Sequence, residues 1–317
     1  MIISAIDIGT NTVLLLIAEV DSQGIITPID HQQRIPRLGK GVDAQHAISV
    51  PAFDRIAWIL NEYKNISLQF QAAKIVACAT SAVRESSNQK EFLDFQRKTT
   101  GIEVEILTGE EEAMLTYQGC MTGISERSQP YAVLDVGGGS TELTFPNPGA
   151  SNGDSKLNRY SFQLGAVRIS ERFFKHDPPR AEEIESARQF ILEELAQVRN
   201  PGLHAYRLIG VAGTATTLAC LDQGLVDFDM QRVSGYEFTP QQIGHWRVKL
   251  GSMSSAEIRG LSHSTEGRAD ILAAGVLIIH EVIELFRFER FIISERGLRY
   301  GMILRDWKER RGAPSTA

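Results

Sequence analysis

The chain has 317 residues, of which 43% are hydrophobic and 23% are charged, and its formal net charge is −6. This length predicts about two domains of roughly 150 residues each, and the composition is typical of a globular protein. The acidic balance argues against a general nucleic-acid-binding protein, and no apolar run approaches the ~20 residues that span a bilayer. We therefore expect no nucleic-acid partner and no membrane partner.

The N-terminus and the cysteines bear on localisation. The chain begins directly with strand-like residues, without a basic region or a small-residue cleavage site, so we expect no signal peptide. Cys78, Cys120 and Cys220 are odd in number, far apart and in apolar segments. This pattern favours buried reduced thiols over a disulfide or zinc framework, and it predicts a cytoplasmic protein.

The first motif in chain order is a strand that ends in an acid and a glycine turn. Residues 3–8 read Ile-Ser-Ala-Ile-Asp-Ile, and Gly9, Thr10 and Asn11 follow before the next apolar run. A glycine turn lets backbone N–H groups face an anion, and a hydroxyl side chain adds a donor. Asp7, at the end of a buried strand, could hold a cation or a metal-bound water. We expect Thr10 and Asn11 to bind phosphate and Asp7 to bind a metal ion.

A basic segment follows, in which Arg34, Arg37 and Lys40 lie close together. It has two interpretations: an exposed, solvated loop, or a charged path that guides the tail of a polyphosphate chain. The two differ in whether these side chains affect long substrates more than short ones.

Residues 74–83 form a strand that runs into a small-residue turn and then a helix. Arg84 lies at or near the start of that helix. It could be a surface arginine paired with a nearby acid, or its planar donors could grip a phosphate. Ser81, in the same turn, is a further candidate phosphate ligand.

The next strand, 104–107, leads into a helix whose first turn is acidic. Thr108 and Glu111 fit a capping box, and Glu110 and Glu112 flank Glu111. Acids at a helix N-terminus can simply complement the helix dipole. However, three successive acids repel each other, and capping needs only one of them. A carboxylate held here could instead orient and deprotonate a water molecule.

Residues 131–145 repeat the plan of the first motif: strand, acid, glycine turn, hydroxyl residue, strand. Three successive glycines in a strand-like region cost entropy, and a tight hairpin needs only one or two of them. We therefore expect the backbone here to approach a ligand closely. Two copies facing each other would clamp a phosphate chain and its metal ion from both sides. In this copy the acid is Asp135, and the candidate phosphate-binding residues are Gly137, Gly138, Gly139, Ser140 and Thr141.

The second half of the chain repeats the first. Residues 207–216 follow the plan of 74–83, and their turn holds Gly213 and Thr214, which are weaker candidate phosphate ligands. Each half closes with one more strand and helix, which in the second half are residues 291–294 and the helix from Gly297. Strands that alternate with helices predict α/β lobes, and a repeat of this size predicts two similar lobes.

The lobes differ in their helices. Helical periodicity also covers residues 181–198, 240–250 and 267–286, and the break at 146–154 is expected to join two strands of the second lobe. We expect a first lobe over residues 1–125 and a second lobe, with the extra helices, over residues 126–317. The last helix, which ends at about residue 310, is a candidate for packing back onto the first lobe.

Five motifs together resemble those of the exopolyphosphatase and guanosine pentaphosphate phosphohydrolase (Ppx/GppA) family, in order and spacing over essentially the whole chain. They are the segments 7–11, 79–84, 109–113, 135–142 and 213–217, and the segments 267–275 and 294–301 resemble that family's late motifs. The resemblance implies the architecture of the actin-like, sugar-kinase and heat-shock-ATPase superfamily, which has two ribonuclease-H-like lobes with a cleft between them. Among family members, the chain resembles the short, two-domain form.

The resemblance also implies a chemistry, which is the hydrolysis of a terminal phosphoanhydride with Mg²⁺ or Mn²⁺. The family's catalytic glutamate falls on Glu112 and its phosphate-binding arginine on Arg84. Its metal-associated acids fall on Asp135 and Glu142. One position departs from the family: Met114 stands where an arginine is usual, which puts one basic contact in doubt but leaves the base in place.

We therefore expect an exopolyphosphatase in which Glu112 activates the attacking water and Arg84 and the glycine turns hold the phosphoryl group. A guanosine pentaphosphate 5′-phosphohydrolase is the alternative within the same chemistry. A kinase of the same architecture would need another base near an acceptor pocket. A non-catalytic sensor of alarmones or polyphosphate would have lost the base. The expected partners are inorganic polyphosphate or guanosine pentaphosphate, and a homodimer is compatible with the sequence.

Overall fold

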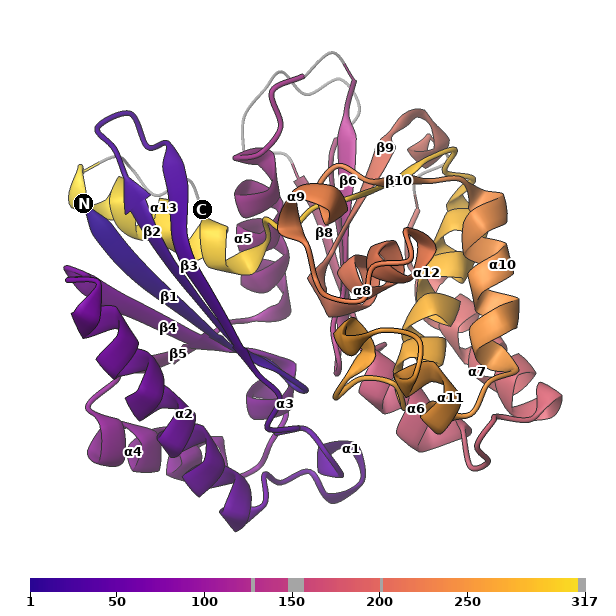
Figure 1. Ribbon diagram of the computed structural model, residues 1–317, viewed down its shortest axis with the longest axis horizontal. Helices are drawn as coiled ribbons and strands as arrows, with labels where there is room; N and C mark the ends of the chain where they lie inside the picture. Colours follow the sequence, from indigo (N-terminus) through magenta and orange to yellow (C-terminus); the bar gives the residue numbers. More distant parts are fainter. Residues whose placement is uncertain (127–128, 148–156, 200–201, 313–317) are drawn as a thin grey trace. The chain divides into compact units, whose positions relative to one another are not determined.

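The computed structural model describes residues 1–126, 129–147, 157–199 and 202–312. The chain forms two compact units (Figure 1). Unit 1 comprises Met1–Gly123 together with Arg296–Ala317, and unit 2 comprises Ile124–Glu295. Whereas the expected second lobe ran from residue 126 to residue 317, unit 2 ends at Glu295, and the last helix belongs to unit 1.

The sheet of unit 1 has five strands in the order β3-β2-β1-β4-β5. The strands β1, β2 and β3 pair antiparallel, whereas β1 and β4, and β4 and β5, pair parallel. Strand β1 is almost entirely buried, which explains its nearly continuous apolar sequence. The strands are β1 (Ile2–Ile8), β2 (Val13–Val20), β3 (Ile26–Arg34), β4 (Lys74–Ala79) and β5 (Val104–Ile106).

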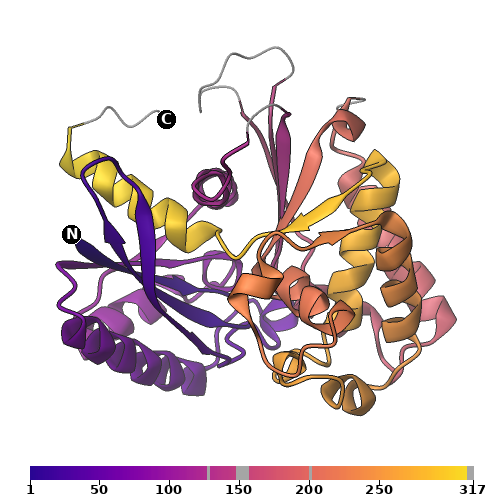
Figure 2. The same ribbon diagram turned by 45° about the horizontal axis from the view of Figure 1, so that its top comes forward.

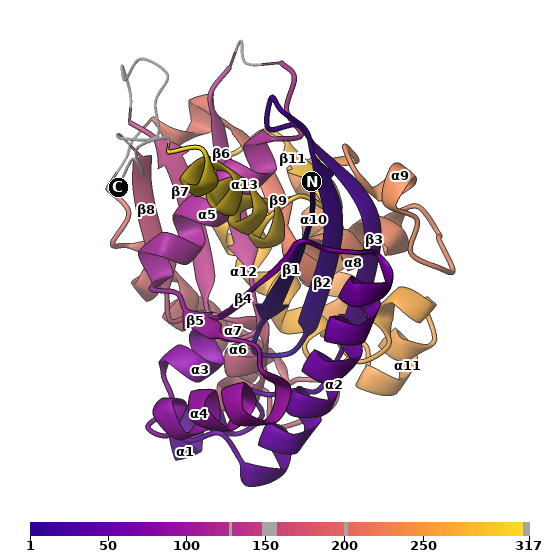
Figure 3. The same cartoon turned by 90° about the vertical axis from the view of Figure 1, so that its left-hand side faces the viewer.

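The sheet of unit 2 has six strands in the order β10-β11-β9-β6-β7-β8. Strands β6, β7 and β8 pair antiparallel, and β9 pairs parallel with both β6 and β11. This is the plan of unit 1 with one added strand, so the predicted duplication is confirmed. Figure 3 shows β8, β7, β6 and β9 in that order. The strands are β6 (Tyr131–Val136), β7 (Thr141–Pro146), β8 (Leu157–Phe162), β9 (Arg207–Val211), β10 (Glu237–Phe238) and β11 (Phe291–Ile293).

Helices cover both faces of the sheet in unit 1. Helices α2 (Val50–Gln69) and α4 (Gln89–Thr100) share one apolar cluster with the sheet, and α5 (Gly109–Met121) and α13 (Leu298–Arg310) share the other. Figure 2 shows α13 and α2 on opposite sides of the sheet. Two short helices complete the unit: α1 (Val42–Gln45) and α3 (Ser81–Arg84).

Close backbone packing holds the last helix in unit 1. A Cβ at Gly301 of α13 would lie 2.6 Å from the carbonyl carbon of Leu115 in α5, and a Cβ at Gly119 would lie 2.6 Å from the Gly301 nitrogen. Only glycine allows two helices to approach this closely. Further along α13, the buried Asp306 accepts from Lys74 Nζ at 2.6 Å and from Arg310 Nε at 2.7 Å.

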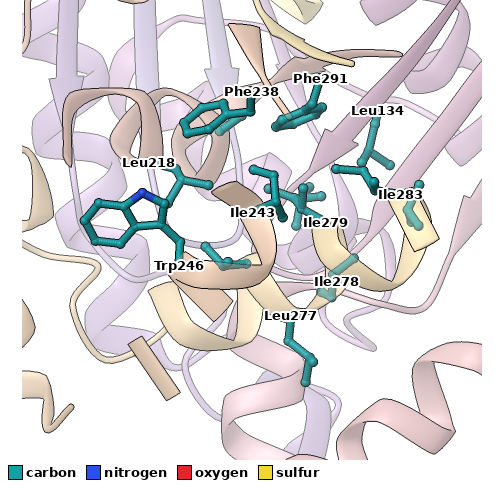
Figure 4. Packing of buried hydrophobic residues seen from close by; sticks show 14 of the residues in the cluster. Leu134, Leu218, Phe238, Ile243, Trp246, Leu277, Ile278, Ile279, Ile283 and Phe291 are labelled. Carbon is teal, nitrogen blue, oxygen red and sulfur yellow. The ribbon is translucent and has the colours of Figure 1, made fainter. Parts of the chain in front are cut away.

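Unit 2 carries more helix, as expected. A large apolar cluster joins strands β6, β10 and β11 to helices α8, α10 and α12, and Figure 4 shows the cluster around Ile279 and Phe291. Helix α12 begins at Leu272 instead of Gly267. Gly267 has a positive φ of 75°, which excludes it from a helix, and Ile271, with φ of −120°, is the N-cap residue. The helices are α6 (Ala166–Phe173), α7 (Ala181–Leu195), η2 (Leu203–Ala205), α8 (Ala212–Asp222), α9 (Met230–Val233), α10 (Pro240–Gly251), α11 (Ser255–Arg259), η3 (His263–Thr265) and α12 (Leu272–Phe286).

Across the ranges that the structure describes, no helix combines the length and the apolar character that crossing a bilayer requires. Most of the expected break at 146–154 lies outside these ranges.

The contact between α5 and α13 predicts the effect of one methyl group. Gly301→Ala places a Cβ against the backbone of α5, so we expect the free energy of unfolding to fall by about 1–3 kcal/mol or more. Gly244→Ala is the matched control, because it adds a methyl group to helix α10 with 3.8 Å to its nearest neighbour, His280 Nε2. Alanine is favoured there by about 0.5–1 kcal/mol. Denaturant unfolding of the two variants measures both effects, and an equal loss in both would contradict this account of the packing.

Candidate active site

Glu112 lies in the first turn of α5, where three neighbouring acids have three different environments. Glu111 Oε2 accepts from Thr108 N and Thr108 Oγ1, both at 2.8 Å, and Thr108 Oγ1 accepts from Glu111 N at 3.2 Å. The expected capping box is therefore confirmed. Glu110 is exposed, whereas Glu112 is turned inward and only 7% exposed. Since Glu111 caps the helix, Glu112 is not needed as a cap.

The partner of Glu112 is Arg84, at the end of α3. Arg84 Nη1 donates to Glu112 Oε2 at 2.8 Å and to the Leu107 carbonyl oxygen at 2.9 Å. Arg84 Nη2 is buried, and within the described residues it has no hydrogen-bond partner. Burial raises the pKa of Glu112, while the charge of Arg84 acts in the opposite direction. The arginine is thus paired with an acid, as one interpretation held, but it keeps a nitrogen that could donate to a phosphoryl oxygen.

Asp7 lies at the end of β1 and alternates with Ile3 and Ala5, which pack in the α5 and α13 cluster. Burial, followed by the charge of Glu112, raises the pKa of Asp7 to about 7, against an opposing effect of Arg299. Asp7 Oδ1 is buried, and the described residues offer it no hydrogen-bond partner. A carboxylate that has one buried oxygen without a donor and lies near a second carboxylate is a site that a cation would stabilise.

The first glycine turn presents its amides in one direction. Thr10 O accepts from Gly39 N at 2.7 Å, and Asn11 O accepts from Arg37 N at 3.1 Å. The N–H and C=O of a trans peptide point in opposite directions, so the N–H groups that follow these carbonyls point away from residues 37–39. Ser81, in contrast, already donates through Oγ to Glu85 Oε1 at 2.7 Å.

Arg34 does not lie in a loop with Arg37 and Lys40, so the expectation of a three-residue basic loop is wrong. It lies in β3 opposite Val13, on the face that α2 covers. Its Nε and Nη2 donate to the carboxylate of Glu62 at 3.1 and 2.5 Å. The strand register therefore uses Arg34 to tie β3 to α2.

The second glycine turn is organised like the first. Gly137 O accepts from Ala166 N at 2.9 Å, Gly138 O from Val167 N at 2.9 Å, and Gly139 O from Arg168 Nε at 2.9 Å. By the same peptide geometry, the N–H groups of Gly138, Gly139 and Ser140 all point away from α6. The described part of the chain offers no acceptor to these three groups. Successive N–H groups of this kind form an anion-binding nest.

The acids of unit 2 lie side by side on neighbouring strands. Asp135 is opposite Glu142 in the β6–β7 pair, and Glu142 is opposite Ser161 in the β7–β8 pair. Ser161 Oγ donates to Glu142 Oε1 at 2.7 Å. Like charges directly opposite each other destabilise a sheet, and a cation would relieve this.

The described residues contain no cluster of three or more acidic, histidine or cysteine side chains that could hold a metal. Mg²⁺, however, usually takes one or two carboxylates and completes its shell with waters and substrate phosphates. Asp135 with Glu142 therefore fits a hydrated Mg²⁺ or Mn²⁺, and so does Asp7.

Arg268 is a buried residue that the sequence did not single out as a candidate ligand. It is 8% exposed, and burial lowers its pKa to about 10. A Cβ at Gly213 would lie 2.6 Å from Arg268 Cζ, so the glycine makes room for the guanidinium at the start of α8. Arg268 Nε has no hydrogen-bond partner among the described residues. A buried guanidinium at a helix N-terminus favours an anion.

The remaining candidates differ in their freedom to contact a ligand. Thr141 Oγ1 is buried and has no hydrogen-bond partner among the described residues. Thr214 is 7% exposed and packs against Gly275 of α12, where an added Cβ would lie 2.6 Å from Thr214 Oγ1. Just before it, Ala212 has a positive φ of 66°. A non-glycine residue in this conformation stores strain, and such strain often marks a ligand site.

Comparison with known proteins identifies what this arrangement is similar to. The profile of the Ppx/GppA phosphatase family matches residues 16–310. Exopolyphosphatase 2 of Mycobacterium tuberculosis is 30% identical over 316 residues, which are 95% of this chain and 97% of that protein. The motif resemblance to this family is therefore confirmed.

Solved structures agree with the fold. An exopolyphosphatase-like protein has a TM-score of 0.90 at 30% identity and covers 98% of this chain and 99% of its own. The Ppx/GppA family member of Aquifex aeolicus has a TM-score of 0.81 at 31% identity, with 98% of each chain covered. A nucleoside triphosphate hydrolase of Neospora caninum, at 11% identity and a TM-score of 0.54, shares the fold alone. The expected α/β fold of the actin-like type is confirmed.

The environment of Arg268 leads to a prediction about stability. Among the described residues no ion pair is formed by Arg268, and a buried charge without a partner is costly to desolvate. We therefore expect Arg268→Met to keep or raise the melting temperature and to weaken the binding of phosphate or pyrophosphate on the order of tenfold, as measured by calorimetry.

Arg188→Met is the matched control. Arg188 Nε pairs with the buried Glu281 Oε2 at 3.2 Å, and removing one partner of such a pair leaves a buried charge. We expect this variant to melt at a lower temperature and to bind phosphate unchanged. A destabilised Arg268→Met with unchanged phosphate binding would make Arg268 a structural residue.

Proposed function

The chain belongs to the Ppx/GppA phosphatase family, a family of phosphoanhydride hydrolases, and from this premise we propose that it removes the terminal phosphate of inorganic polyphosphate. The observation that carries the proposal is the pairing of Glu112 with Arg84. One guanidinium holds the candidate base through Nη1 and keeps Nη2 for a ligand. The names of the exopolyphosphatase relatives support polyphosphate as the substrate.

The reaction follows from these residues. The Glu112 carboxylate accepts a proton from a water molecule while the water oxygen bonds to the terminal phosphorus. The bond from this phosphorus to the bridging oxygen breaks, and that oxygen leaves with the shortened chain. Because Arg84 is bonded to Glu112, the phosphoryl group that Nη2 holds is also placed next to the base.

Charge on the phosphate oxygens would be met by preorganised donors. The N–H groups of Gly138, Gly139 and Ser140 are fixed by the bonds that their carbonyls make to the start of α6, so they need no rearrangement when an anion binds. We propose that Thr10, Thr141, Arg268 and the Gly213 turn bind phosphate oxygens as well. A bound Mg²⁺ would neutralise charge that develops on the phosphate oxygens. Asp135 with Glu142 in unit 2, and Asp7 in unit 1, are the acids that we propose for metal ions.

The alternative functions differ from the proposed one in their substrate or in the absence of turnover. A guanosine pentaphosphate 5′-phosphohydrolase would use the same residues on a nucleotide, and a non-catalytic sensor would bind without turnover. Phosphate release from long polyphosphate, from tripolyphosphate and from guanosine pentaphosphate, measured in parallel, distinguishes them. Fastest release from polyphosphate supports the proposal, whereas release from guanosine pentaphosphate alone, or from none of the three, contradicts it.

Glu112→Gln should retain the fold and substrate binding but lose most turnover. The change keeps the shape of the side chain and removes the base, which commonly contributes about 10²–10⁴-fold. Glu111→Gln is the matched control, because Glu111 lies next to Glu112 and only caps α5. We expect the control to keep normal turnover and to change stability little, because glutamine at this position also fits the capping box. Phosphate release by Glu112→Gln within twofold of the parent protein would remove Glu112 from the mechanism.

Asp135→Asn should raise the Mg²⁺ concentration needed for half-maximal phosphate release. The reason is the loss of one of two carboxylates that lie opposite each other on β6 and β7. A Mg²⁺ titration at saturating substrate measures the shift. If the midpoint is unchanged and only the maximal rate falls, Asp135 is structural.

The basic side chains predict a dependence on chain length. If Arg37 and Lys40 guide the polyphosphate tail, replacing both by Ala should weaken long chains severalfold at low salt and leave tripolyphosphate nearly unchanged. The loss should shrink as salt rises, since exposed charges are screened over about 8–10 Å. Arg34→Ala is the control, because Arg34 is bound to Glu62, and we expect it to affect long and short substrates equally. Equal effects of the Arg37 and Lys40 changes on both substrates would place the tail elsewhere.

A further inference from the structure

Arg299 is a charged residue of unit 1 to which the proposed mechanism assigns no role. It is the second residue of α13, directly after the segment in which Gly297 and Gly301 pack against α5. An added Cβ at Gly119 of α5 would lie 2.6 Å from Gly301 N. The start of α13 is therefore fixed by backbone contact with the helix that carries Glu112.

The guanidinium of Arg299 reaches the strands beside Asp7. Its Nη1 donates to the Leu15 carbonyl oxygen at 3.0 Å and lies 3.4 Å from His31 Nδ1. Leu15 is opposite Ile6 in the β1–β2 pair, so it lies one position from the register partner of Asp7, which is Leu14. These contacts place the guanidinium of Arg299 at β2, one register position from Leu14, which is the strand partner of Asp7.

The neighbouring His31 ring adds no positive charge to that of Arg299. Burial, together with the charge of Arg299, lowers the pKa of His31 to about 4, so the ring is neutral at pH 7. Its Nδ1 can then accept from Arg299. Arg84 thus contacts Glu112 directly, whereas Arg299 acts on Asp7 through space.

We propose that the positive charge of Arg299 substitutes for a cation beside Asp7 and thereby weakens the binding of a free divalent cation to unit 1. The inference rests on the proposed function only in taking Asp7 as a cation-binding acid. A fixed positive charge repels a second cation, so Asp7 holds a metal ion tightly only when other negative charge arrives with it. The polyphosphate chain would supply that charge, so a metal ion would bind at Asp7 more tightly with the substrate than without it.

The test is the affinity of the full chain for Mn²⁺ without substrate, measured by electron paramagnetic resonance. We expect Arg299→Met to bind Mn²⁺ on the order of tenfold more tightly than the parent protein, because one nearby positive charge is gone. Arg299→Gln, which can still donate to the Leu15 carbonyl, should behave in the same way and serves if Arg299→Met does not fold. Arg299→Lys keeps the charge and should bind like the parent.

Two controls separate this effect from others. Arg311→Met removes a positive charge just after α13, where the guanidinium lies over the Trp307 ring, and should leave Mn²⁺ binding unchanged. Asp7→Asn combined with Arg299→Met should lose the gain in affinity. The proposal is overturned if the neutral Arg299 variants bind Mn²⁺ no more tightly than the parent protein, or if neither they nor the parent bind it. It is also overturned if the gain in affinity persists in the variant that lacks Asp7. Phosphate release by the parent protein is measured separately, so a failure of the proposed function is recognised independently.

Discussion

The site in unit 1 depends on one buried ion pair, between Arg84 and Glu112. A carboxylate at this depth is costly unless a charge compensates for its lost hydration, and Arg84 supplies that charge at 2.8 Å. The Leu107 carbonyl fixes the guanidinium, and the capping box of Thr108 and Glu111 fixes the start of α5. These contacts orient the carboxylate before any ligand binds, which is the preorganisation that phosphoryl transfer requires.

Both glycine turns orient their amides by the same hydrogen-bonding pattern. Their carbonyl oxygens accept from a following segment, residues 37–39 in unit 1 and residues 166–168 in unit 2. Because N–H and C=O oppose each other in a trans peptide, occupying the carbonyls turns the amides to the other side. The repeated sequence plan thus carries a repeated backbone arrangement. Gly165 is part of it, since an added Cβ there would overlap the peptide between Gly138 and Gly139.

Local patterns in the sequence predicted much of the fold and part of the site. Strand alternation, the capping box at Thr108 and the duplicated hairpin are all encoded by near neighbours, so the elements and the candidates Asp7, Glu112 and Asp135 could be found. What depends on register or on distant packing could not. Arg34 was misplaced because its partner Glu62 lies on another element. The surroundings of Arg268 and Arg299 could not be predicted, because they include Gly213 and Leu15, which are far away in the chain.

The central claim is that Glu112 directs water to the terminal phosphorus. Hydrolysis of tripolyphosphate in ¹⁸O-enriched water, followed by mass spectrometry of the products, tests it most directly. Attack at the terminal phosphorus places one ¹⁸O atom in the released orthophosphate and none in the pyrophosphate, because the bridging oxygen leaves with the longer product. Label in the pyrophosphate would show that water attacks the inner phosphorus. This result would contradict the assignment of Glu112 and Arg84 to attack at the terminal phosphorus.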